Sequence, residues 1–420
     1  MLFRSLTGKE VQKQLVGENA LTVDRIGIGV SGAVAVNDVD DTITATVNHT
    51  GTMTSSKEGT LAVSAANTTF IFANTGSKSS RAAGGEESFS AGLSGAVSVI
   101  VGGSDVEASV RRARIDGFRI DVGATNKRVV GTVAVSGSGG AVGGNGSLTV
   151  NFAGSVAVTS LTTRSIATVD RVTGTSLVGA AIKADTRDLV WTIAGSFVGN
   201  VSSKLVRGRY LLGDGLKNAA DNGRSAAVGA SVAVTNVDST TKAVVGASTL
   251  GFVRGNLDVL ATESSTAFTA SGGGSFVSTG GTAKALYASG NNAGSSVAGF
   301  VAVARVDPTV EASITDSTVT MAPAGGDVSV LATTALLLVT ASGGLVINRD
   351  GGGTPSASVG AAVTVVKSTT RGSGRIERSD VTVPKGKVRV RATNGNPADG
   401  EWREFDPILG DLNMPEAGSG

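Results

Sequence analysis

Few residues of this 420-residue chain are of the kinds that carry out chemistry. Cysteine is absent, which excludes disulfides, thiolate nucleophiles and cysteine-ligated zinc. The single histidine, His49, stands in VNHTGT between two strand-like segments, and the sequence around it supplies no partners for a Ser-His-Asp triad. We therefore interpret His49 as an exposed residue of a turn.

Aspartates follow several of the repeated segments of the chain. Asp38, Asp40 and Asp41 lie in AVNDVDDT, and Asp238 and Asp307 occupy related places in TNVDST and ARVDPT. Carboxylates at a turn could bind calcium through their oxygens. More often they accept hydrogen bonds from the amides of the turn itself, and this is the interpretation that we favour.

Glycine-rich segments suggest two further kinds of site, and both fail on their motifs. GGNGSLTVN from Gly143 resembles the calcium-binding nonapeptide GGxGxDxUx, but Leu148 stands where the ligand aspartate belongs. SGGG at Ser271 and GGG at Gly351 lack the lysine and hydroxyl residue that follow in a phosphate-binding loop. The sequence predicts no metal, no cofactor and no catalytic residues.

Most of the chain is instead one repeated unit. SGAVAV from Ser31 recurs as SGAVSV, GSVAVT, GASVAVT, GFVAVA and GAAVTV. The glycines of these openings are 59 to 75 residues apart, at Gly32, Gly95, Gly154, Gly229, Gly299 and Gly360. Self-similarity at such a period indicates a repeat architecture.

Composition indicates what kind of repeat this is. The chain has 60 glycines and is 40% hydrophobic, but only 4% of its residues are aromatic and 17% are charged. Small aliphatic side chains must therefore form the core, which favours a thin solenoid over a thick globular domain. Short alternating runs rich in Val and Thr, separated by Gly, Asn, Asp and Ser, predict strands and little helix.

We expect an all-β fold, a right-handed parallel β-helix, in preference to a series of antiparallel sandwiches. With coils of on the order of 20 residues, each repeat would form about three coils, and the stack would be a rod roughly 90 to 100 Å long. Valine and alanine of the repeated opening would face inward. Glycines would occupy the corners, where a bend often needs a positive φ.

Three segments depart from the repeats, which we place at residues 21–393. Residues 1–20 form an N-terminal cap or the continuation of an upstream region, with a short helix expected at 11–16. Residues 201–224 form an insertion loop, and residues 394–420 a C-terminal tail or linker. The insertion concentrates side chains that could bind a partner, namely Lys204, Arg207, Arg209 and Tyr210.

Charge and hydropathy indicate which classes of partner the chain could bind. The net charge is +2 with mixed signs throughout, so nucleic acid is not an expected partner. No apolar run has the length and composition of a membrane-spanning helix, and residues 1–20 contain no signal peptide. If the protein is exported, we expect this chain to be a fragment or a processed region.

The repeats resemble the β-helical regions of large bacterial exported adhesins and exoproteins, the filamentous haemagglutinin-like and leukotoxin-type filamentous adhesins. The residues that carry the likeness are AAVGASVAVTNVDSTTKAVVGASTL from Ala226 and their echo SSVAGFVAVARVDPTVEASITDSTV from Ser295. The resemblance implies a secreted or surface-exposed stalk, an autotransporter-like passenger that passes an outer-membrane translocator and attaches to a host surface protein or glycan.

A second class of function is a carbohydrate-active enzyme or a tailspike-like glycan-binding protein, because β-helices also host polysaccharide lyases and hydrolases. A hydrolase needs two carboxylates within several ångströms of each other on adjacent coils, whereas the aspartates here are dispersed. We expect no enzyme. A groove with adjacent acidic and aromatic side chains would favour the enzyme, and a smooth Ser/Thr/Asn surface would favour the stalk.

Overall fold

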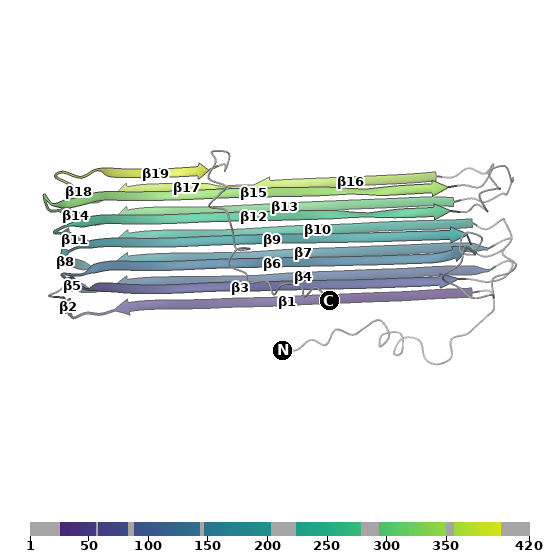
Figure 1. The fold of residues 1–420 in the computed structure, drawn as a ribbon, viewed down its shortest axis with the longest axis horizontal. Coiled ribbons are helices and arrows are strands. Elements are labelled where there is room, and N and C mark those ends of the chain that lie inside the picture. The colour runs from purple at the N-terminus through teal and green to yellow at the C-terminus, as the bar shows by residue number, and fades with distance from the viewer. Residues whose placement is uncertain are drawn as a thin grey trace, which may run out of the picture.

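The structure is a computed structural model that describes residues 26–55, 58–82, 88–142, 147–202, 224–278, 294–349 and 357–395. These residues form β-strands and no helix, and the strands make three parallel sheets stacked in chain order (Figure 1). The predicted parallel β-helix is confirmed. The predicted helix at 11–16 lies outside the described residues.

Each coil of the β-helix consists of a long strand, a short strand and a second long strand. The first long strands form sheet A: β1 Ile26–Asn48, β4 Phe89–Arg111, β7 Leu148–Asp170, β10 Arg224–Gly246, β13 Gly294–Thr315, β16 Ala357–Ser368 and β17 Arg371–Glu377. The short strands form sheet B: β2 Thr52–Thr54, β5 Arg114–Asp116, β8 Thr173–Leu177, β11 Thr249–Phe252, β14 Thr318–Met321 and β18 Asp380–Thr382.

The second long strands form sheet C, which faces sheet A across the core. They are β3 Thr60–Ala82, β6 Arg119–Val142, β9 Gly179–Ser202, β12 Gly255–Ser278, β15 Gly325–Arg349 and β19 Val388–Gly395. Sheet B closes one narrow end of the coil between them (Figure 1). The described chain therefore forms six coils, the last with a much shortened sheet C strand.

One repeat of the sequence forms one coil, so the prediction of about three coils per repeat is wrong. Val34 pairs in register with Val97 of the next repeat, and the same column continues through every coil. The strands are much longer than sequence alone suggested: β1 has 23 residues, which span about 75 Å, whereas six coils stack to only about 29 Å. The long dimension follows the strands and not the stack (Figure 1).

The direction of the repeated opening is also opposite to the prediction for valine. In β4, Ala96 and Ser98 point into the core, while Val97 and Val99 point outward. The alternation is strict because successive residues of a strand face opposite sides of the sheet. Only the small residues of SGAVAV are therefore internal.

The interior changes character along the strands. Near sheet B, it is a continuous core of Val, Ile, Leu and Ala drawn from all three sheets, including Ile115, Leu250 and Ile314. At the opposite end, the two long sheets are separated by small residues, mostly Ala, Ser, Thr and Gly, with small alanine clusters such as Ala96, Ala157 and Ala233.

The corner after each sheet A strand is not made by glycine, contrary to the prediction. Non-glycine residues with positive φ stand there in five successive coils: Arg112, Arg171, Ala247, Asp316 and Arg378. The next residue is a stacked serine in the last three coils, and its hydroxyl accepts a hydrogen bond from the backbone of the preceding coil. Ser317 Oγ, for example, accepts from Ser248 N at 3.1 Å. Glycine does occupy the other corner at Gly117 and Gly255, with φ near +75°.

Candidate functional site

The outer surfaces of sheets A and C each divide into an apolar half and a charged half. On sheet A, the apolar half is formed by the first part of each strand, and on sheet C by the last part, so both lie at the end away from sheet B (Figure 1). Large exposed apolar patches on a protein mark interaction surfaces. These two surfaces are the candidate functional sites.

The apolar half of sheet A is a regular array, which we call the valine face. Four outward columns cross all six coils. The first is Val30, Leu93, Phe152, Val228, Val297 and Val359. The second is Gly32, Gly95, Gly154, Ala230, Gly299 and Ala361. The third is Val34, Val97, Val156, Val232, Val301 and Val363, and the fourth is Val36, Val99, Val158, Val234, Val303 and Val365.

The valine face contains no charge and no hydroxyl group, and its column of glycine and alanine forms a furrow between ridges of larger side chains. Several ridge residues are well exposed: Val34 by 71% and Val363 by 51%. Charge begins in the very next outward column, which holds Asp38, Arg305 and Lys367. The boundary between the two halves of sheet A is therefore sharp.

The apolar half of sheet C is less regular and contains a groove of about 800 Å³, which we call the glycine groove. Its floor includes the backbone of Gly137, Gly199 and Gly274, and its sides include Phe197, Phe276, Leu345 and Val135. Phe197 and Leu345 are 60% and 63% exposed. The residues that line the groove include one charged side chain, Lys78, and no carboxylate.

Glycine in sheet C makes room for aromatic rings on neighbouring strands. A methyl group at Gly131 would overlap the ring of Trp191 on one side, and would come within 2.7 Å of Phe72 on the other. The rings thus lie over bare backbone of the next coil, which is how aromatic residues commonly compensate for glycine in a sheet. The glycines of the repeats therefore shape an outer surface as well as turns.

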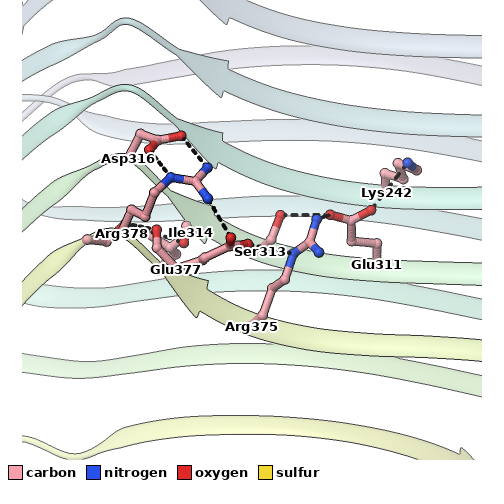
Figure 2. A network of polar contacts seen from close by, with 9 residues as sticks. Lys242, Glu311, Ser313, Ile314, Asp316, Arg375, Glu377 and Arg378 are labelled. Atoms are coloured by element: carbon pink, nitrogen blue, oxygen red, sulfur yellow. Dashed lines mark hydrogen bonds and ion pairs between the residues drawn. The ribbon is translucent and has the colours of Figure 1, made fainter.

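The charged halves are crossed by ion pairs that run from coil to coil (Figure 2). Glu311 of β13 accepts from Lys242 of β10 at 3.2 Å and from Arg375 of β17 at 2.5 Å, so one carboxylate ties three successive coils together. At the corner that follows, Arg378 donates two hydrogen bonds to the carboxylate of Asp316, at 2.6 and 2.9 Å, and also forms an ion pair with Glu377.

These contacts change the acidity of the carboxyl groups. Partial burial acts to raise the pKa of Glu311, but the hydrogen bond and charge of Lys242, together with the charge of Arg375, lower it below its ordinary value. The hydrogen bond from Arg378 likewise lowers the pKa of Asp316. Both groups are therefore ionised and paired at neutral pH. A hydrolase would instead need a carboxyl group held protonated beside a second carboxylate.

A ladder of buried threonine hydroxyls crosses the interior from coil to coil. Thr132, Thr159, Thr192, Thr235 and Thr269 alternate between sheets C and A, and successive hydroxyls are 2.7 to 2.8 Å apart. All five side chains are fully buried. Each hydroxyl can donate one bond and accept others, so the ladder satisfies itself without water.

Three buried ionisable residues lie between this ladder and the apolar core. Arg128 of β6 is adjacent in register to Asp188 of β9, and the guanidinium occupies space beside Gly102, donating to Thr162 O at 3.1 Å. Burial lowers the pKa of Arg128 and raises that of Asp188, while each charge acts to offset the shift of the other.

Glu263 of β12 is the third of these residues and is fully buried. Burial raises its pKa to about 7, although hydroxyl groups of Ser239, Ser265 and Thr241 donate to the carboxylate. The three groups are enclosed between the sheets, where no substrate reaches them. None of the three was predicted from the sequence as a buried charge. The alternation of the strand could have revealed them. In β6, every second residue faces inward, and Arg128 falls in the same inward series as Val122, Ala124 and Val130.

The structure separates the residues that the sequence suggested as calcium ligands. Asp40 points outward and accepts a hydrogen bond from Gly103 N at 2.7 Å, whereas Asp41 points inward and accepts from Asn67 and Thr69. Asp238 and Asp307 are paired in register, as their related sequences indicated. Among the described residues, no three His, Asp or Glu side chains are placed to hold a metal ion.

The predicted binding residues Lys204, Arg207, Arg209 and Tyr210 lie outside the described residues. The ends of the predicted insertion are strand: Val201 and Ser202 belong to β9, and Arg224 begins β10. His49 follows β1, and its backbone amide bonds to Arg111 O at 3.3 Å. The apolar outer halves were not predicted, because the valines that form one of them were assigned to the core.

Comparison of the chain with family models, with curated proteins and with solved structures finds no match. A search of the described ranges for a helix long and apolar enough to span a membrane also finds none. The two outer surfaces are therefore the features of the described residues that bear on function.

Proposed function

We propose that the chain is the structural and adhesive part of a bacterial surface-exposed or secreted protein, a non-catalytic β-helical stalk that attaches through the glycine groove of sheet C. The stack supports the structural role, because six coils held in register by parallel ladders form a stiff body. The resemblance of the repeats to exported adhesins supports the location.

The observation that carries the adhesive role is the composition of the groove. Phe197, Phe276 and Leu345 project from a floor of glycine backbone and are not covered by any described residue of the chain. Rigid aromatic side chains supply contact area at a small cost in conformational entropy, and they are enriched where proteins bind one another. The groove therefore fits an apolar segment of a host surface protein better than a glycan, which needs polar partners.

The same groove supports the stalk over the carbohydrate-active enzyme. An enzyme of that kind would place carboxylates among the aromatic side chains, and the lining of the groove includes none. Carboxylates such as Glu311 and Asp316 lie on the charged half of sheet A or at its corner, where arginine and lysine pair with them.

A binding panel tests the proposal. We expect the chain to bind immobilised host surface and matrix proteins, and the substitution Phe197→Asn to weaken that binding at least tenfold. The matched control is Arg187→Asn, also exposed on the outer face of β9 but in its charged half. Equal binding by the two variants, binding to glycans alone, or cleavage of a polysaccharide would each contradict the proposal.

A further inference from the structure

We propose that the valine face of sheet A is the interface of a symmetric dimer, with a second copy of this chain as the occupant. The face is uncharged across all six coils, and no described residue covers it. An exposed apolar surface of this extent and regularity marks an interaction site. This surface is on the opposite sheet from the glycine groove, so the inference does not depend on the proposed function.

The area of the face agrees with a stable dimer. Four columns with their side chains span about 25 Å along the strands, and six strands span about 29 Å, which gives about 700 Å² per copy. Two such faces would bury about 1,400 Å², within the range of specific protein interfaces. The glycine groove does not offer a comparable flat area, because Phe197 and Leu345 stand up from its floor.

The ridges and the furrow of the valine face fit the furrow and the ridges of a second copy. A two-fold axis parallel to the stacking direction, between the glycine column of Gly32 and the valine column of Val34, reverses the strands of one copy against the other. Each valine ridge of that column then enters the furrow of the partner copy. Identical side chains of two flat sheets interdigitate in this way in other tightly packed β structures.

Charge selects this orientation over the one with parallel strands. Parallel strands would bring the charged halves of the two copies into the interface, where columns such as that of Asp40, Asp238 and Asp307 would lose contact with water. Reversing the strands sets apolar half against apolar half. The charged halves then extend beyond the interface at opposite ends of the dimer.

The first experiment measures the oligomeric state of the whole chain by sedimentation equilibrium at micromolar concentration. We expect a dimer for the natural sequence and for Thr240→Lys, which is on the charged half of β10, and a monomer for Val232→Lys on the valine face of the same strand. Phe197→Asn on sheet C should leave the dimer intact. A monomeric natural chain, or a dimer lost with Phe197→Asn but retained with Val232→Lys, would overturn the proposal.

The second experiment measures orientation without altering the face. Because the chain contains no cysteine, a single introduced cysteine carries a spin label at a unique place. Labels at Ser160→Cys and Thr162→Cys on β7 should be about 33 Å and about 46 Å from their counterparts in the partner copy, since the axis is five and seven residues away along the strand. Short and equal distances at both sites would show parallel strands and contradict the strand-reversed dimer.

Discussion

The buried threonine ladder makes single hydroxyl groups matter to stability. Thr192 stands at its centre, bonded on one side to Thr159 at 2.7 Å and on the other to Thr235 at 2.8 Å. Substitution Thr192→Val keeps the shape of the side chain but leaves two neighbouring hydroxyls short of a buried partner. We expect a loss of about 1 to 3 kcal/mol in the free energy of unfolding.

Chemical denaturation followed by circular dichroism measures this loss. The conservative variant Thr192→Ser retains a hydroxyl and should recover most of the stability. If Thr192→Val were as stable as the natural protein, the hydroxyl of Thr192 would not contribute to stability and the prediction would be wrong.

Glu263 should make stability depend on pH. Its pKa is near 7 in the folded protein and near 4.5 in the unfolded chain, because burial penalises the charged form. Between these values the folded state holds a proton that the unfolded state has released. The contribution of Glu263 to stability is therefore fully present below about pH 4.5, falls as the pH rises to about 7, and stays constant above that. The full difference corresponds to about 3 kcal/mol.

Substitution Glu263→Gln should remove this dependence and raise stability above pH 8, as measured by thermal unfolding from pH 5 to 9. Asp188, whose pKa burial also raises, remains in the variant and contributes in the same direction. The control is Glu107→Gln on the outer face of β4, where Glu107 forms a partly exposed ion pair with Arg111 that contributes little. An unchanged pH profile in Glu263→Gln would show that the carboxyl is not responsible.

At the scale of elements, the corner after sheet A is where the backbone is strained. Ala247 has φ of 46°, a conformation that costs a residue with a Cβ roughly 1 kcal/mol or more, and glycine much less. We therefore expect Ala247→Gly to raise the free energy of unfolding by about 1 kcal/mol. The comparison is Ala230→Gly in the middle of β10, which should lower it, because glycine weakens the interior of a strand.

The long strands show how far the sequence could predict the elements. The columns of Val, Ala and Gly were predictable, because similar residues stack in successive coils. The 23-residue length was not: Asn37 to Asp41 looks like a turn, yet it lies inside β1. Asp38 and Asp40 face solvent there, and β4 pairs with β1 in register along its whole length, so the sheet overrides the turn preference of these residues.

Inward and outward positions were only partly predictable for a related reason. Alternation is visible in SGAVAV, but both its alanines and its valines are apolar, so composition does not say which set is internal. The narrow space between sheets A and C decides the question, because it admits Ala96 and Ala157 and leaves the larger valines outside. That spacing comes from the packing of two distant parts of each coil.

At the scale of the whole molecule, stability should vary along the stack. The β16 strand is exposed along its whole length, and β19 covers only the first part of β15, whereas β7 and β10 have a full-length strand on both sides. In a solenoid each coil is held by its neighbours, so the incomplete last coil should open first.

Hydrogen exchange with mass spectrometry would show this as the slowest exchange in β7, β9 and β10 and the fastest in β16. The internal comparison is between β16 and β10, which contribute the same columns to sheet A. Uniform exchange across all six coils would indicate that the stack opens as a single cooperative unit.

Because one repeat forms one coil, the number of repeats sets the thickness of the molecule and the length of each repeat sets its length. Mutation of the gene could change these two dimensions independently. Duplication or loss of a repeat would add or remove one strand spacing, about 4.8 Å of thickness, and would leave the length of the molecule as it is. Longer or shorter strands would change the length, but only if every coil changed together, because each column must stay in register. Variants of this chain that arise by recombination should therefore differ in thickness and share one length.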